Sequence, residues 1–130
     1  MTDHDVLERV RSLLSDLQRA VRAKDHAAVL DLFTEDAALL GTAAANLDRE
    51  AVSSYVARVF DQTGYVHWEW DTVTVLDARP GAVTFVALGT VSLAGDPDDD
   101  SRDPIRLTCL AVEDGERWRL RLFHGSVPQA

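Results

Sequence analysis

The segment Trp118-Arg-Leu-Arg-Leu-Phe-His-Gly-Ser126, close to the end of the chain, decides the fold class. Apolar side chains alternate with arginines along it, as in a β-strand that turns one face toward a core. β-favouring residues also dominate three earlier stretches, and turn signals separate all four. We therefore predict antiparallel hairpins built from strands over 65–76, 82–94, 104–112 and 117–127.

The first half of the chain has a helical period instead. Apolar residues recur every three or four positions in three stretches, and Thr2 and Asp25 suit the N-termini of the first two. They predict helices near 3–23, 26–33 and 48–61, and a short strand over 37–40. Gly64 is the residue that stops the third helix. An apolar sheet face must be covered, so we expect an α+β fold with three helices packed on a strongly bent antiparallel sheet.

The composition indicates a single soluble domain over residues 1–130. Hydrophobic residues make up 46% and charged residues 27%, as in ordinary soluble proteins. A net charge of -9 would repel nucleic acid, so no nucleic-acid partner is expected. No apolar run reaches the ~18 residues of a membrane span, and no signal peptide begins the sequence. We expect a cytoplasmic protein without membrane contact, and a buried, unreactive Cys109.

The order of these elements resembles the NTF2-like (cystatin-like) superfamily, and in particular its SnoaL-like members. The resemblance covers essentially the whole chain and is carried by four motifs: Ala23-Lys-Asp25, Leu32-Phe-Thr-Glu-Asp-Ala37, Arg106-Leu-Thr108 and the segment from Trp118 to Pro128. The ending Phe123-His-Gly-Ser126 is also similar to the association domain of calmodulin-dependent protein kinases. The resemblance implies a cone-shaped fold with an open cavity, and a homodimer joined through the convex side of the sheet.

The superfamily includes ketosteroid isomerases, scytalone dehydratase, limonene epoxide hydrolases and polyketide cyclases, which use carboxylates, tyrosines or histidines in the cavity. By its spacing from Glu35-Asp-Ala37, the general base of the isomerases falls at Gly41, which has no side chain. Their oxyanion tyrosine falls near Leu17, an apolar residue of the first helix. The resemblance therefore disfavours steroid isomerisation, and the catalytic residues stay unassigned.

The final strand supplies two candidate site residues, His124 and Ser126. Strict alternation places them on the same face as Leu120 and Leu122, opposite the arginines, so we expect both to point inward. His124 could be a general base, a hydrogen-bond donor to a ligand or a satisfied core histidine. We expect it to contact a ligand near Trp68 or Trp70, in the strand over 65–76. Ser126 lacks a partner set for a nucleophile, which leaves a ligand contact.

The strand over 65–76 could turn either face toward the helices. Trp68 and Trp70 share one face, and His67, Glu69 and Asp71 share the other. Inward tryptophans would line an aromatic pocket or fill the core, whereas an inward polar set could hold a metal. Charged residues that alternate with large apolar ones usually mark a solvated face, so we expect no metal. The acidic loop at 96–103 could hold calcium, but it lacks the glycine and glutamate of a known calcium loop.

Two further residues complete the candidate ligand site. Tyr55 lies on the apolar side of the third helix. Arg106 would receive a carboxylate if it pointed inward, while an outward Arg106 would belong to a charged sheet surface.

Two classes of function remain open. The first is a protein that binds a small apolar or aromatic ligand, either as a plain binder or as an isomerase, dehydratase or cyclase. The second is a dimerisation or assembly domain without catalysis. The sequence contains no GxGxxG, phosphate loop, CxxC or HExxH, so we expect neither a cofactor nor a structural zinc.

Overall fold

The computed structural model describes residues 2–41, 43–62, 66–92 and 102–128. Its helices are α1 (Asp3–Arg22), α2 (His26–Asp31) and α3 (Arg49–Gln62). Its strands are β1 (Phe33–Leu40), β2 (Ala45–Asn46), β3 (His67–Arg79), β4 (Ala82–Ser92), β5 (Asp103–Asp114) and β6 (Arg117–Ser126). The α+β class is confirmed. Some predicted boundaries lie outside the described residues. They are the helix stop at Gly64, the start of the strand at 65, the end of the following strand at 94 and most of the acidic loop.

The strands form one sheet in the order β2-β1-β6-β5-β4-β3. Three hairpin-like pairings from β3 to β6 are antiparallel, as predicted, and so is the pairing of β1 with β2. The expectation of a wholly antiparallel sheet is wrong, because β1 runs parallel to β6. No turn joins these two strands. β1 follows α2 near the start of the chain, whereas β6 is the last strand of the sequence. The sheet is therefore mixed.

Local signals account for where α1 and the hairpins lie. The Thr2 hydroxyl accepts a hydrogen bond from the Asp5 amide, and the Asp5 carboxylate accepts one from the Thr2 amide, so α1 begins with a capping box. Gly81 and Gly115 occupy the β3–β4 and β5–β6 turns with φ of +80° and +68°, a region that glycine adopts without strain. These turns lie where the sequence predicts them.

The region around Phe33 differs from the prediction. The helix expected over 26–33 ends at Asp31, and the strand expected at 37 already begins at Phe33. Phe33 pairs with Leu120 of β6, and the Leu120 amide donates a 2.8 Å hydrogen bond to the Leu32 carbonyl. Pairing with a strand nearly ninety positions away thus draws this segment out of the helix. The two-residue β2, which was not predicted, pairs with β1 and forms the edge of the sheet.

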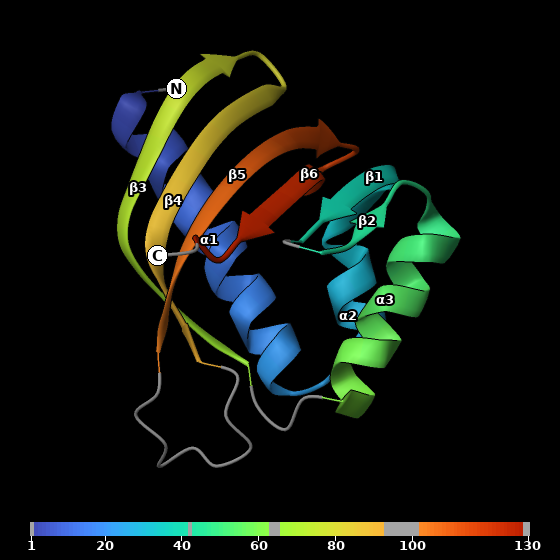
Figure 1. Cartoon of the computed structure of the whole chain (residues 1–130). Coiled ribbons are helices and arrows are strands. Elements are labelled where there is room, and N and C mark those ends of the chain that lie inside the picture. Colours follow the sequence, from blue (N-terminus) through green and yellow to red (C-terminus); the bar gives the residue numbers. More distant parts are fainter. Residues whose placement is uncertain (1, 42, 63–65, 93–101, 129–130) are drawn as a thin grey trace.

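The helices cover one face of the sheet and leave part of it open. Figure 1 shows β3, β4 and β5 curving around α1, while α2 and α3 lie beside β1 and β2. The buried stripe of α1 packs on the inward residues of the long strands, among which Phe85 and Cys109 have no exposed surface. Cys109 is therefore the buried hydrophobe predicted from the sequence, and burial raises the pKa of its thiol.

Bulges give the sheet its bend. The β3–β4 register shifts between Trp70 and Thr72 and again between Val75 and Asp77, and the β5–β6 register shifts at Leu110. A bulge bends its strand and increases the local twist, so these shifts curl the sheet around α1. Each shift also exchanges the inward and outward faces of the residues that follow it.

Candidate functional site

A cavity of about 340 Å³ lies between the helices and the concave face of the sheet. The α1 wall consists of Leu17 and Val21, whose spacing of four keeps both on one helix face. The α3 wall is Tyr55, Val56, Val59 and Phe60. The sheet wall includes Trp68, Val91, Ile105, Phe123 and Ser126. This volume is in the range of cavities that hold small organic molecules.

The two tryptophans face the helices, which decides between the two orientations left open by the sequence. Trp68 lines the cavity, and its backbone amide donates a 2.6 Å hydrogen bond to the Gln18 side chain of α1. Trp70 stacks on Trp68 with ring centroids 6.3 Å apart, and packs against the core without lining the cavity. Trp68 also meets Phe123 at 6.2 Å between centroids. One tryptophan thus forms cavity wall, and the other supports it.

The predicted inward orientation of His124 is wrong. Leu120 pairs with Ala111 but Leu122 pairs with Leu110, so Arg121 is an extra residue in β6. Beyond this bulge the alternation is reversed: Phe123 is buried and His124 is exposed on the outer face of the sheet. The assumption of strict alternation across 118–126 caused the error.

Ser126 borders the cavity at the end of β6, but the same bulge turns its side chain to the outer face with His124, so its predicted inward orientation is wrong and its backbone forms the wall. Arg106, which pairs with Ser126 across the β5–β6 ladder, is exposed and does not line it. Arg106 therefore does not point inward to receive a carboxylate. It points outward, which is the alternative that the sequence left open. Of the six predicted ligand contacts, the structure brings together Tyr55, Trp68 and Ser126 at the cavity. It leaves Trp70, His124 and Arg106 away from its wall.

Gly41 lies at the same end of the cavity and was considered in the sequence only as a missing base. A Cβ atom placed on Gly41 would lie 3.5 Å from the Tyr55 hydroxyl oxygen. Phe33 and Phe123 are further wall residues that sequence reasoning missed. For Phe123, the bulge at Arg121 hides the signal, since simple alternation assigns it to the outer face.

A network of ion pairs outside β1 and β6 was also not predicted. Asp31 accepts a hydrogen bond from Arg117, which holds the pKa of this carboxyl below its usual value, and it also pairs with Arg119. Asp36 pairs with Arg121 at 3.2 Å; the Thr34 hydroxyl foremost, and then Arg121, lower the pKa of its carboxyl.

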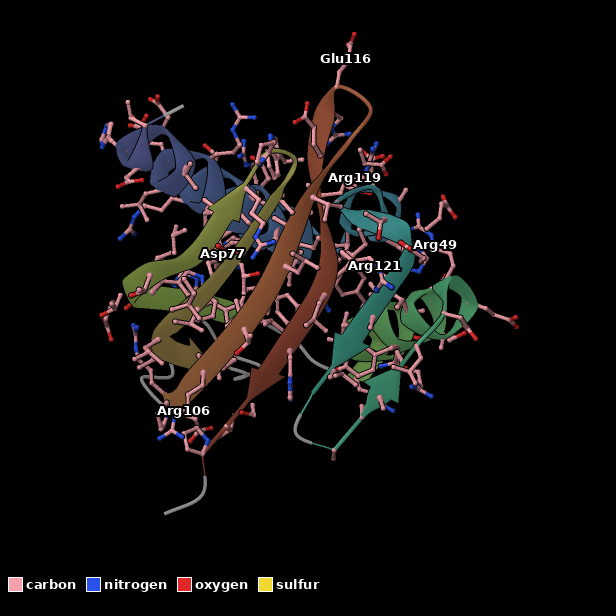
Figure 2. The ribbon with its side chains drawn as sticks, turned by 90° about the horizontal axis from the view of Figure 1, so that it is seen from above. Arg49, Asp77, Arg106, Glu116, Arg119 and Arg121 are labelled. Atoms are coloured by element: carbon pink, nitrogen blue, oxygen red, sulfur yellow. The ribbon has the colours of Figure 1, made fainter. Side chains whose placement is uncertain are left out.

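Arg49 belongs to the same side of the molecule. Figure 2 shows Arg49, Arg119 and Arg121 near one another, with Arg106 apart from them. The Arg49 guanidinium donates hydrogen bonds to the carbonyls of Leu30, Phe33 and Thr34 at 2.9, 3.2 and 3.4 Å. Arg49 thereby joins the start of α3 to the α2–β1 connection, and so helps to position the α3 wall of the cavity.

Over the described ranges, no three or more histidine, cysteine, aspartate or glutamate side chains gather closely enough to hold a metal ion. Glu69, one of the polar set on β3, pairs with Arg102 at 2.5 Å and with His67 at 3.4 Å. The Arg102 contact is the main reason that the pKa of Glu69 lies below its usual value. In the same part of the chain, no helix is both long enough and apolar enough to cross a bilayer.

The chemistry available in the cavity follows from its wall. All described wall residues are uncharged, and Tyr55 places a side-chain hydroxyl near Gly41, whereas the Ser126 hydroxyl is on the outer face of the sheet. The wall offers apolar and aromatic contact with a small number of hydrogen-bonding groups, the usual composition of a small-molecule site.

Comparisons with known proteins agree with this architecture. Residues 10–130 match the family described as SnoaL-like domain, whereas a comparison with curated proteins found no match. A proposed dehydratase from the NTF2-like family of Streptomyces avermitilis has a TM-score of 0.85 at 15% identity, over 99% of this chain and 100% of that one. A protein with a cystatin-like fold from Nostoc punctiforme has a TM-score of 0.83 at 17% identity, over 100% and 96%.

A third similar structure is a proposed calcium/calmodulin-dependent protein kinase II association domain from Xanthomonas campestris. Its TM-score is 0.80 at 20% identity, over 92% of this chain and 85% of that one. At such identities these structures establish the fold, and they confirm the resemblance inferred from the sequence motifs. The match over residues 10–130 shows that the chain belongs to the SnoaL-like domain family, with the NTF2-like, cystatin-like fold.

Proposed function

We propose that this domain binds a small, mainly apolar molecule in the cavity between α1, α3 and the sheet. The observation that carries the proposal is the cavity itself, about 340 Å³ with an almost wholly apolar wall. Trp68, Phe60 and Phe123 place aromatic rings on it from three different elements. Aromatic walls favour a planar or apolar guest, because burial of its surface is favourable without any need to desolvate charge.

The proposal is tested by filling the cavity. Val59 is a half-buried wall residue of α3, and Val59→Phe would put a ring into the space that the guest needs. The neutral probe N-phenyl-1-naphthylamine gains fluorescence in apolar sites, and a titration of the wild-type protein with it should saturate. The variant should bind at least about tenfold more weakly, equivalent to about 1.4 kcal/mol.

Ala57→Phe is the matched control, since Ala57 is an exposed residue on the solvent side of the same helix. It adds a ring to α3 without entering the cavity, so probe affinity should stay at the wild-type level. An unsaturable wild-type titration, or equal losses in the two variants, would contradict ligand binding at this site.

The second candidate function is assembly through the outer face of the sheet. Leu88 is 47% exposed on β4, and apolar surface of that kind is often covered by a partner. One similar structure is itself a proposed association domain. The expected homodimer would bury this face and leave the cavity unused. Sedimentation should then show a species of twice 14.3 kDa that Leu88→Lys converts to monomer, and a wild-type monomer at micromolar concentration would reject the assembly proposal.

A further inference from the structure

Three features meet at one end of the cavity and make it chemically different from the remainder. Leu40 pairs with His124 in the parallel β1–β6 ladder, so the next residues along, Gly41 and Gly125, continue side by side and Ser126 follows. The Tyr55 hydroxyl lies over Gly41, at 3.5 Å from the position of an added Cβ. Gly41, Tyr55 and Ser126 all line the cavity. The Tyr55 hydroxyl thus lies at the end of the cavity where β1 and β6 leave the sheet, whereas Ser126 pairs with the exposed Arg106 and has its side chain on the outer face.

Glycine at position 41 keeps this corner open. Any side chain there would occupy the space directly below the Tyr55 hydroxyl, since that oxygen is the nearest atom to the missing Cβ. The Gly41 amide is already engaged, as it donates a 2.9 Å hydrogen bond to the Ala44 carbonyl. The Tyr55 hydroxyl is therefore the side-chain polar group at this corner that a guest would meet.

The charge of the wall limits what the guest can be. Among the described wall residues there is no charged side chain, so an ionised group brought into the cavity would be buried without a partner. The chain's net charge of -9 further disfavours an anion approaching the site. A neutral hydroxyl or carbonyl, in contrast, can exchange a hydrogen bond with water for one with the Tyr55 hydroxyl.

We propose that the cavity selects a neutral apolar molecule that carries one hydroxyl or carbonyl group, which the Tyr55 hydroxyl binds beside Gly41. The inference rests on the proposed ligand binding and specifies both the class of ligand and its orientation. The apolar body lies against Trp68 and Phe123, and the oxygen atom points toward the ends of β1 and β6.

Three probes of the same ring size test the selection: naphthalene, 2-naphthol and 2-naphthoate, titrated against tryptophan fluorescence at neutral pH. One neutral hydrogen bond should make 2-naphthol bind about 3- to 10-fold more tightly than naphthalene. The carboxylate of 2-naphthoate should make it the weakest of the three. Tyr55→Phe should abolish the preference for 2-naphthol and leave the affinity for naphthalene unchanged, whereas Ser126→Ala, on the outer face, should keep the preference.

Ser54→Ala, at an exposed position of α3 next to Tyr55, is the matched control and should keep the full preference. Gly41→Ala gives a second route to the same corner, and should weaken 2-naphthol more than naphthalene. Equal affinities for naphthalene and 2-naphthol, tightest binding of 2-naphthoate, or a preference that survives Tyr55→Phe would overturn the inference while ligand binding stands. Failure of all three probes to bind would overturn both.

Discussion

Gly89→Ala should destabilise the fold, because an added Cβ atom would collide with the backbone of β3. Gly89 pairs with Trp70 next to the first bulge of β3. A Cβ atom on Gly89 would overlap the Glu69 carbonyl oxygen and lie 2.9 Å from both the Glu69 carbonyl carbon and the Trp70 Cα. These are backbone atoms, which cannot rotate away as the end of a side chain would. The strands must therefore separate or shift.

The expected magnitude combines two opposing effects. Forcing an extra methyl group into a packed site typically destabilises by about 1–3 kcal/mol. Replacing glycine by alanine restricts the unfolded chain and returns about 0.4–1 kcal/mol. The net loss is about 1–2 kcal/mol. With an unfolding entropy of about 2.1 cal/mol/K per residue, a 130-residue chain should lose about 4–7 °C in Tm.

Urea unfolding and thermal melting, both followed by circular dichroism, measure this loss. Gly41→Ala is the matched control, because its added Cβ has an ordinary contact of 3.5 Å to the Tyr55 hydroxyl oxygen. It should unfold at the wild-type urea concentration or slightly above it. Trp68 lies two residues before Trp70, the partner of Gly89, and lines the cavity. A shift of β3 in Gly89→Ala should therefore also weaken probe binding. A Gly89→Ala protein with the wild-type Tm and urea midpoint would refute the reasoning.

Two further predictions concern the polar contacts around β1. Arg49→Met removes the donor for three backbone carbonyls, and should lower the free energy of unfolding measured in urea by about 2–3 kcal/mol. Arg49→Lys should restore little of this stability, because lysine lacks the planar fork of the guanidinium group. Full restoration by lysine would contradict this role of Arg49. Asp31 has a lowered pKa in the folded state, mainly through Arg117, so its carboxylate stabilises the fold above its ordinary pKa of 3.8 and that stabilisation is lost as the pH falls through the lowered value. Asp31→Asn should therefore be less stable than wild type at neutral pH and should lose less stability on acidification; parallel pH profiles would contradict the assignment.

Features set by neighbouring residues were predictable from the sequence. The periodic stripe of α1 and its cap at Thr2 gave a helix from residue 3, and the structure begins it at Asp3. Turn residues at Gly81 and Gly115 located two hairpins, because left-handed backbone conformations are strained for other residues. The fold class follows from these elements, since helices and a sheet with one apolar face have few ways to cover each other.

Features set by distant pairing were not predictable in the same way. Phe33 belongs to β1 because β6 is beside it, and nothing within residues 26–36 announces a neighbour from the end of the chain. The bulge at Arg121 has a similar origin, because it adjusts β6 to two neighbouring strands at once. One extra residue was enough to exchange the predicted positions of Phe123 and His124. A site argument based on alternation holds only up to the next bulge.

The candidate site depends on this exchange more than on any other detail of the fold. In an NTF2-like cavity the shape is common to many proteins, and the chemistry comes from the side chains placed in it. At position 41, where the base of the isomerases would fall, this chain has no side chain, and at 124 its histidine faces outward, so neither position supplies a proton acceptor to the cavity. General acid–base chemistry requires such a group within hydrogen-bond reach of the reacting atom. The Tyr55 hydroxyl remains on the described wall and can hydrogen-bond a neutral oxygen of a guest. The proposed selection of an apolar guest therefore rests on Tyr55 and on the apolar side chains around it.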